Sequence, residues 1–89
     1  MKEYLPLGTV VLLKNGTKKI MIYGRKQIQA STGDIFDYVA CLYPEGNISA
    51  EYTFLFNEDQ IDEVIFKGFS NEEEKQFLQV LDDNDKANS

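Results

Sequence analysis

The chain contains no histidine and no tryptophan, and it has one cysteine. Histidine is the most frequent general base and metal ligand, so its absence removes the usual groups for acid–base catalysis and metal binding. A single cysteine, Cys41, excludes an intrachain disulfide and favours a reducing compartment. We therefore expect a cytoplasmic protein that is not an enzyme and that uses no cofactor or metal ion.

Long hydrophobic runs are missing as well. No apolar segment approaches the roughly 18–20 residues that a membrane span needs, and the N-terminal stretch MKEYLPLGTV lacks the apolar region of a signal peptide. Neither of the glycine-rich phosphate-binding patterns, GxGxxG and the P-loop, occurs. These absences predict a protein without a membrane span, without a secretory leader and without a phosphate-binding loop.

Basic residues are few and unevenly placed. The net charge is −6, which disfavours general nucleic-acid binding. Residues 1–33 hold six basic residues and one acidic residue, a net +5, whereas residues 34–89 hold three and fourteen, a net −11. The sequence leaves two interpretations open: a charge division that steers a charged partner, or a lysine-rich hairpin beside a solvated acidic surface.

Apolar residues, in contrast, make up 43% of the 89 residues, enough for one small domain with one core. Five segments have the alternation or β-branched composition of strands. They are residues 9–13, 18–24, 35–43, 51–56 and 61–66. Asn15-Gly16 predicts a hairpin between the first two strands, and Ile28 has the parity of Ile20 and Ile22, so the second strand can extend to residue 29.

The segment Asp37–Asn47, DYVACLYPEGN, is apolar on both strand faces and ends in turn residues. This pattern is typical of a central strand covered on both sides, with Cys41 in the core and chemically quiet, because apolar burial raises the pKa of a thiol. A short polar link, NEDQ, predicts one helical turn before the last strand.

One helix is expected near the C-terminus. Ser70 and Glu73 form a capping box, and the apolar spacing predicts a helix over residues 71–81 that docks through Phe77 and Leu81. The acidic end, DDNDKANS, carries no large apolar residue. We therefore expect one domain over residues 1–82 and a frayed tail over residues 83–89.

These elements predict a mainly β, α+β fold. A small five-stranded antiparallel sheet, bent into an SH3-like partly open barrel with one C-terminal helix, fits the chain length. A flat meander with the helix packed on one face is the alternative.

Candidate functional residues are confined to surface contacts. The segment KKIMIYGRKQIQ interleaves basic and aromatic residues, as nucleic-acid-binding barrels do, but the net charge makes an ordinary strand with a lysine-rich face the better interpretation. Tyr43 can lie at the rim of the sheet, where an amphipathic ring suits a protein interface. The candidate protein-interaction residues are Lys18, Lys19, Tyr23, Arg25 and Tyr43.

Four stretches together resemble, in order and spacing, a family of short uncharacterised proteins of Gram-positive bacteria encoded beside LXG-type toxins in type VII secretion loci. These stretches are YLPLGTVVLLKNGTKKIMIYGR, DYVACLYPEGN, FLFNEDQIDEVIFKGF and NEEEKQF. The resemblance covers residues 4 to about 78. It brings no catalytic residues to this chain.

The resemblance implies an accessory role in toxin export, as a cytoplasmic chaperone or targeting adaptor that binds an LXG toxin. Immunity proteins are also small, acidic and encoded beside such toxins, so neutralisation of a cognate toxin is the first alternative. A regulatory β-barrel that binds nucleic acid or a small ligand is the second. The sequence identifies neither the contact face nor the oligomeric state.

Overall fold

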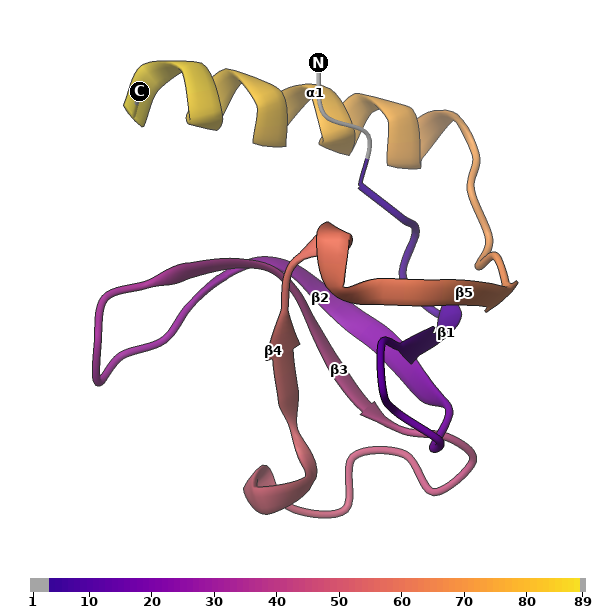
Figure 1. Cartoon of the computed structure of the whole chain (residues 1–89). Helices are drawn as coiled ribbons and strands as arrows, with labels where there is room; N and C mark the ends of the chain where they lie inside the picture. The colour runs from indigo at the N-terminus through magenta and orange to yellow at the C-terminus, as the bar shows by residue number, and fades with distance from the viewer. Residues whose placement is uncertain (1–3, 89) are drawn as a thin grey trace.

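The structure of the protein is a computed structural model that describes residues 4–88, with side chains placed up to residue 83. One sheet contains all five strands (Figure 1). They are β1 (Val10–Leu13), β2 (Ile20–Ile28), β3 (Ile35–Leu42), β4 (Phe54–Phe56) and β5 (Ile61–Phe66). Two single-turn 3₁₀ helices, η1 (Ala50–Tyr52) and η2 (Glu58–Gln60), flank β4, and the helix α1 (Glu72–Asn88) follows β5.

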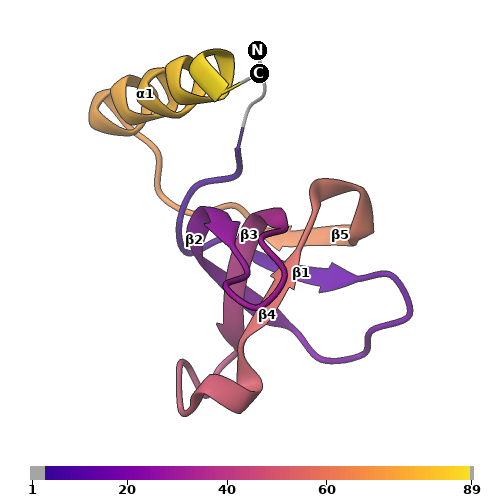
Figure 2. The same cartoon turned by 90° about the vertical axis from the view of Figure 1, so that its left-hand side faces the viewer.

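Every neighbouring pair of strands is antiparallel, and the strand order is β4-β3-β2-β1-β5. A sequential meander would leave β5 beside β4, but β5 pairs with β1 instead. Within residues 4–88, β4 and β5 are both edge strands, so the sheet is bent and open rather than closed into a barrel (Figures 1 and 2). The predicted fold class is confirmed, and the flat meander is wrong.

Strand β2 is long and contains a bulge at Tyr23. Ile22 pairs with Ala40 and Gly24 pairs with Val39, so Tyr23 has no partner across the ladder. One extra residue reverses the inward and outward alternation beyond it. Arg25 therefore lies on the core side, opposite Tyr38, and Ile28 is 66% exposed. The predicted extension of the second strand is confirmed, since β2 reaches Ile28. The reason given for it was wrong, because the bulge places Ile28 on the opposite face from Ile20 and Ile22.

Gly24 permits the close approach of β2 and β3 at this bulge. A Cβ at this position would lie 2.6 Å from Cγ1 of Val39, closer than real Cβ atoms come to a neighbour. A larger residue would force the Val39 side chain or the two strands to shift where the inward and outward alternation reverses.

The largest buried cluster lies on one face of the sheet, and Val10, Val39 and Cys41 are buried on the other face. Tyr38 is fully buried, with Tyr4 at 6.0 Å in an edge-to-face arrangement and Phe56 at 5.5 Å between ring centroids. The amide of Leu5 donates a hydrogen bond of 2.9 Å to the Tyr38 hydroxyl oxygen. The aromatic contacts and this bond attach the N-terminal segment to the sheet, beneath α1 (Figure 1). The cluster is Tyr4, Val11, Ile20, Ile22, Tyr38, Ala40, Phe56 and Leu81.

The fourth predicted strand is shorter than expected. Residues 50–52 form η1, held by the hydrogen bonds from the Tyr52 amide to the Ser49 carbonyl and from the Thr53 amide to the Ala50 carbonyl. Only Phe54–Phe56 pairs with β3. The predicted single turn in NEDQ is confirmed as η2, where the Asn57 amide donates to Oε1 of Gln60 at 2.8 Å.

Helix α1 begins one residue later than the capping box predicted. The Oδ1 of Asn71 accepts the Glu74 amide at 3.1 Å, so Asn71 is the N-cap and Ser70 is not. Asparagine and serine cap helices equally well, and sequence spacing alone did not separate the two. The helix continues to Asn88, so its predicted end at Leu81 was also wrong.

Leu81 docks α1 in the core, as expected, and Leu78 packs against the same cluster. Phe77 does not: it is 48% exposed, and the Arg25 guanidinium lies 5.4 Å from its ring centroid. The bulge at Tyr23 brings Arg25 into the space between sheet and helix, and Phe77 packs on that cation instead of on core side chains.

Candidate protein-interaction site

A groove lies on the sheet face opposite the core. In the ladder, Phe66 pairs with Val10, Val10 with Met21, and Met21 with Cys41, so these side chains form a row across four strands. The groove has a volume of about 530 Å³. We call it the outer groove, and its lining side chains are Val10, Lys19, Met21, Tyr43, Ile65 and Phe66.

A second bulge gives the outer groove much of its apolar surface. Val10 pairs with Phe66 and Val11 pairs with Val64, so Ile65 is the extra residue of β5. A bulge re-aims a side chain that regular alternation would send to the other face, and both Ile65 and Phe66 line the groove. They are 39% and 62% exposed, so this face is open to solvent.

Three of the five predicted interaction residues meet at one end of the outer groove. Lys19 and Tyr43 both line it, and the Tyr43 amide donates a hydrogen bond of 3.0 Å to the Lys19 carbonyl. Lys18 is exposed and pairs with Glu45 at 2.9 Å. Its hydrogen bond lowers the pKa of the Glu45 carboxyl. This leaves the Lys19 ammonium as the cation at this end of the groove.

The other two predicted residues lie further along β2. Tyr23 is 40% exposed at the bulge. Arg25 makes a bidentate ion pair with Glu74 of α1, in which Nη2 donates to Oε1 at 2.9 Å and Nη1 donates to Oε2. The two side chains are 4% and 13% exposed. Arg25 therefore holds α1 against the sheet.

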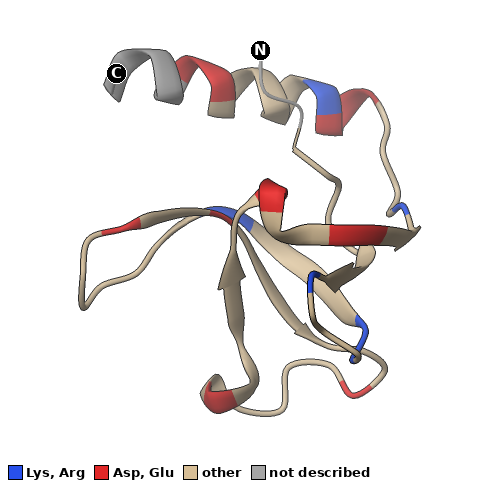
Figure 3. Ribbon diagram, in the orientation of Figure 1, with Lys and Arg blue, Asp and Glu red and all other residues tan. Residues whose placement is uncertain are grey.

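The charge division of the sequence is only partly a division of the surface. The cations Lys18 and Arg25, from the basic N-terminal third, each pair with an acid from the remainder. Figure 3 shows basic residues around the β1–β2 connection, with an acidic residue in the β3–β4 connection nearby. Acidic residues also colour η2, β5 and the first turn of α1.

A second groove adjoins the first. Gly8 lines the outer groove and Leu7 lines the next one. The Gly68 amide donates a hydrogen bond of 3.0 Å to the Thr9 hydroxyl oxygen, which joins these residues to the segment after β5. We call this the helix groove. It has a volume of about 450 Å³, and its lining includes Leu7, Phe69, Glu73 and Phe77.

Cys41 is 1% exposed, so its predicted burial is confirmed. Its thiol points to the Met21 carbonyl oxygen, 3.7 Å away. The thiol is closed to solvent and faces a backbone carbonyl, so it takes no part in the surface of the groove.

An acidic hollow at η2 has a structural explanation. The Glu58 amide donates to Oδ2 of Asp37 at 2.8 Å, and the Asp37 amide donates to Oδ1 of Asn57 at 3.0 Å. These bonds fix η2 to β3, and the hollow between them is lined by Asp37, Asn57, Glu58 and Asp59. Among the residues that the structure describes, no group of three or more acids or cysteines is placed to hold a metal ion.

Sequence reasoning missed most of the outer groove. It selected the cations and tyrosines but left out Val10, Met21, Ile65 and Phe66. A signal existed in the pairs Val10-Val11 and Ile20-Met21, which are apolar on both faces of their strands. The bulge at Ile65 left no such signal, because it depends on how β5 pairs with β1.

The fold and the surface define a small, mainly β domain with one C-terminal helix and an exposed apolar groove. The chain belongs to the family described as Domain of unknown function (DUF4176), whose model matches residues 4–77. No curated protein and no solved structure matches the chain. In the described part of the chain, α1 is neither long nor apolar enough to cross a membrane.

Proposed function

We propose that the protein is a non-catalytic binding module that recognises an LXG-type toxin in the cytoplasm and prepares it for export by type VII secretion. The observation that carries the proposal is the outer groove, where exposed Tyr43, Ile65 and Phe66 line an apolar surface with Lys19 at its end. Exposed apolar surfaces of this kind mark binding sites, and aromatic residues are typical of protein interfaces.

The choice of partner follows from the resemblance of the sequence to proteins encoded beside LXG-type toxins. The lack of histidine in the sequence and the burial of Cys41 support binding rather than catalysis. The net charge of −6 supports a protein partner over nucleic acid.

The test is to co-express the protein with the LXG-type toxin of its own strain and to measure co-purification, toxin activity and export. We expect a stable complex, an active toxin in the complex, and toxin lost from the culture supernatant when the gene is deleted. A complex that abolishes toxin activity, with unchanged export and self-poisoning of the deletion strain, would establish immunity instead. Absence of any complex would refute the proposal.

A further inference from the structure

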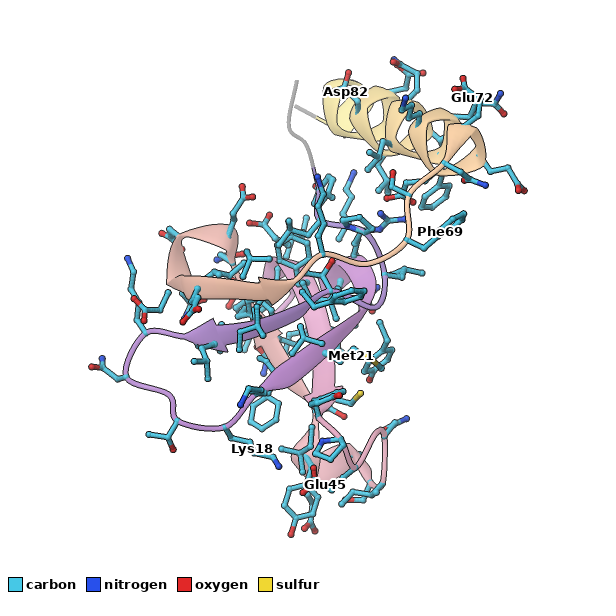
Figure 4. All side chains as sticks on the ribbon, turned by 90° about the vertical axis from the view of Figure 1, so that its right-hand side faces the viewer. Lys18, Met21, Glu45, Phe69, Glu72 and Asp82 are labelled. Carbon is cyan, nitrogen blue, oxygen red and sulfur yellow. The ribbon has the colours of Figure 1, made fainter. Side chains whose placement is uncertain are left out.

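The outer groove and the helix groove adjoin at Gly8 and Leu7, and oppositely charged side chains line their far ends. The outer groove is mainly apolar, whereas the helix groove combines Leu7, Phe69 and Phe77 with the polar residues Arg25, Asn71, Glu73 and Glu74. Figure 4 places Met21 between Lys18 and Glu45 on one side and Phe69 and Glu72 on the other. At the first end, Lys19 is the cation not engaged by Glu45. At the other end, Glu72 and Glu73 are exposed in the first turn of α1, beside the 79%-exposed Phe69.

The occupant of this surface must bring its own backbone hydrogen bonds. Strands β1, β2 and β3 are each paired on both sides. A partner on this face therefore meets side chains, because the backbone N–H and C=O groups of these strands already bond to neighbouring strands. The edge of β5 is a poor template for an added strand. Its register with β1 shifts twice, and it carries Asp62 and Glu63. Bulges and charges of this kind blunt an edge against pairing.

We infer that the outer groove and the helix groove together bind an amphipathic α-helix of the protein partner. A helix satisfies its backbone internally and presents one apolar stripe. Charge complementarity sets its direction: its acidic end lies at Lys19, which lines the outer groove, and its basic end lies at Glu73, which lines the helix groove. The inference rests on the proposed binding function and adds the chemistry of the bound segment.

The probe is a synthetic helical peptide of about 18 residues, about 27 Å long, which fits the 35 Å longest dimension of the protein. It carries one leucine stripe, glutamates at one end and lysines at the other. A peptide of the same composition with the stripe scrambled is the control. NMR spectra of the isotope-labelled protein locate the contact, and fluorescence anisotropy measures the dissociation constant.

We expect the striped peptide to shift the amide signals of Met21, Tyr43, Phe66 and Phe69, and the scrambled peptide to shift none. Phe66→Ser should weaken binding at least about tenfold, as loss of a central aromatic contact does. Ile28→Ser is the matched control, since Ile28 is 66% exposed and Phe66 is 62% exposed. It should leave affinity within about twofold.

Three results would overturn the inference: no shifts with the striped peptide, equal shifts with both peptides, or shifts centred on Ile28 and Ile35. Concentration-dependent shifts at Phe66 without peptide, with a dimer by light scattering, would assign the surface to a second copy and also overturn it. Co-purification of the toxin with the Phe66→Ser variant at wild-type yield would refute the surface and leave the binding function standing. Peptide binding without a toxin complex would refute the function and leave the surface standing.

Discussion

At the scale of single residues, the reactivity of Cys41 reports how tightly side chains pack on the sheet face that carries the outer groove. Its side chain is 1% exposed and contacts the Met21 carbonyl. We expect a thiol reagent to label native Cys41 at least about a hundred times more slowly than the urea-unfolded chain, because access requires opening of the sheet. Cys41→Ala should lower the free energy of unfolding by about 1–2 kcal/mol, as small core truncations do. Native labelling at the rate of a free thiol would contradict this.

Tyr38 tests the core face. Burial raises the pKa of its hydroxyl to about 12, above the value of about 10 in an unfolded chain. The folded state therefore holds this proton more tightly. The resulting stability is complete below about pH 10 and is lost as the pH rises to about 12, by up to about 2–3 kcal/mol.

Urea unfolding from about pH 8 to about pH 11, compared with Tyr38→Phe, measures this effect. The other tyrosines and the lysines titrate in both proteins, so the difference between the two curves isolates Tyr38. The wild-type midpoint should fall more steeply above pH 10. Parallel curves would show that Tyr38 ionises equally easily in both states.

At the scale of elements, the N-terminus of α1 distinguishes two capping residues. Asn71→Ala removes the acceptor of the Glu74 amide and should cost about 1 kcal/mol. Ser70→Ala is the matched control. It should change stability by less than about 0.5 kcal/mol, because Ser70 is exposed and does not cap the helix. Chemical denaturation gives both values, and the reverse order would restore Ser70 as the cap.

The attachment of α1 to the sheet depends on Arg25 and Glu74. Glu74→Gln leaves a buried guanidinium without its counter-charge and should cost about 3–5 kcal/mol. The double variant Arg25→Met with Glu74→Leu should recover most of that loss, since no buried charge remains. Stability from urea unfolding, with a double-mutant cycle, gives the coupling energy.

The exposed pair Lys18–Glu45 is the comparison for this cycle. Both side chains are more than 40% exposed, so solvent screens their attraction and Glu45→Gln should lower the free energy of unfolding far less than Glu74→Gln does. Equal losses at the two pairs would mean that the Arg25–Glu74 pair does not hold the helix.

At the scale of the whole molecule, charge placement predicts the salt dependence of partner binding. Affinity should fall as salt rises from about 50 mM to about 150 mM, where the screening length is about 8 Å. Lys19→Glu should slow association more than it speeds dissociation. Lys18→Glu should have the smaller effect, because Lys18 is already paired with Glu45. Stopped-flow binding of the toxin measures both rates, and equal effects of the two variants would contradict this placement.

Local sequence patterns predicted the type of most elements correctly, but they misplaced several of the residues at which elements begin or end. The alternation in residues 35–43 identified β3, and Asn15-Gly16 marked the β1–β2 connection, where Asn15 has φ 66°. The predicted strand over residues 51–56 lost its first half to η1, and the helix cap moved from Ser70 to Asn71. These boundaries depend on differences of about 1 kcal/mol between local alternatives, which composition does not resolve.

The amino-acid pattern by itself determined the class of the protein: five short strands, one amphipathic helix, one core and a buried Cys41. Apolar periodicity decides these features, because burial of apolar surface is the dominant favourable term in folding. Tertiary pairing decided the rest. The bulges at Tyr23 and Ile65 depend on the register in which β2 pairs with β3 and β5 pairs with β1. The bulge at Tyr23 places Arg25 on the core side, where it forms the ion pair with Glu74 that holds α1 against the sheet. The bulge at Ile65 places that side chain beside Phe66 in the lining of the outer groove.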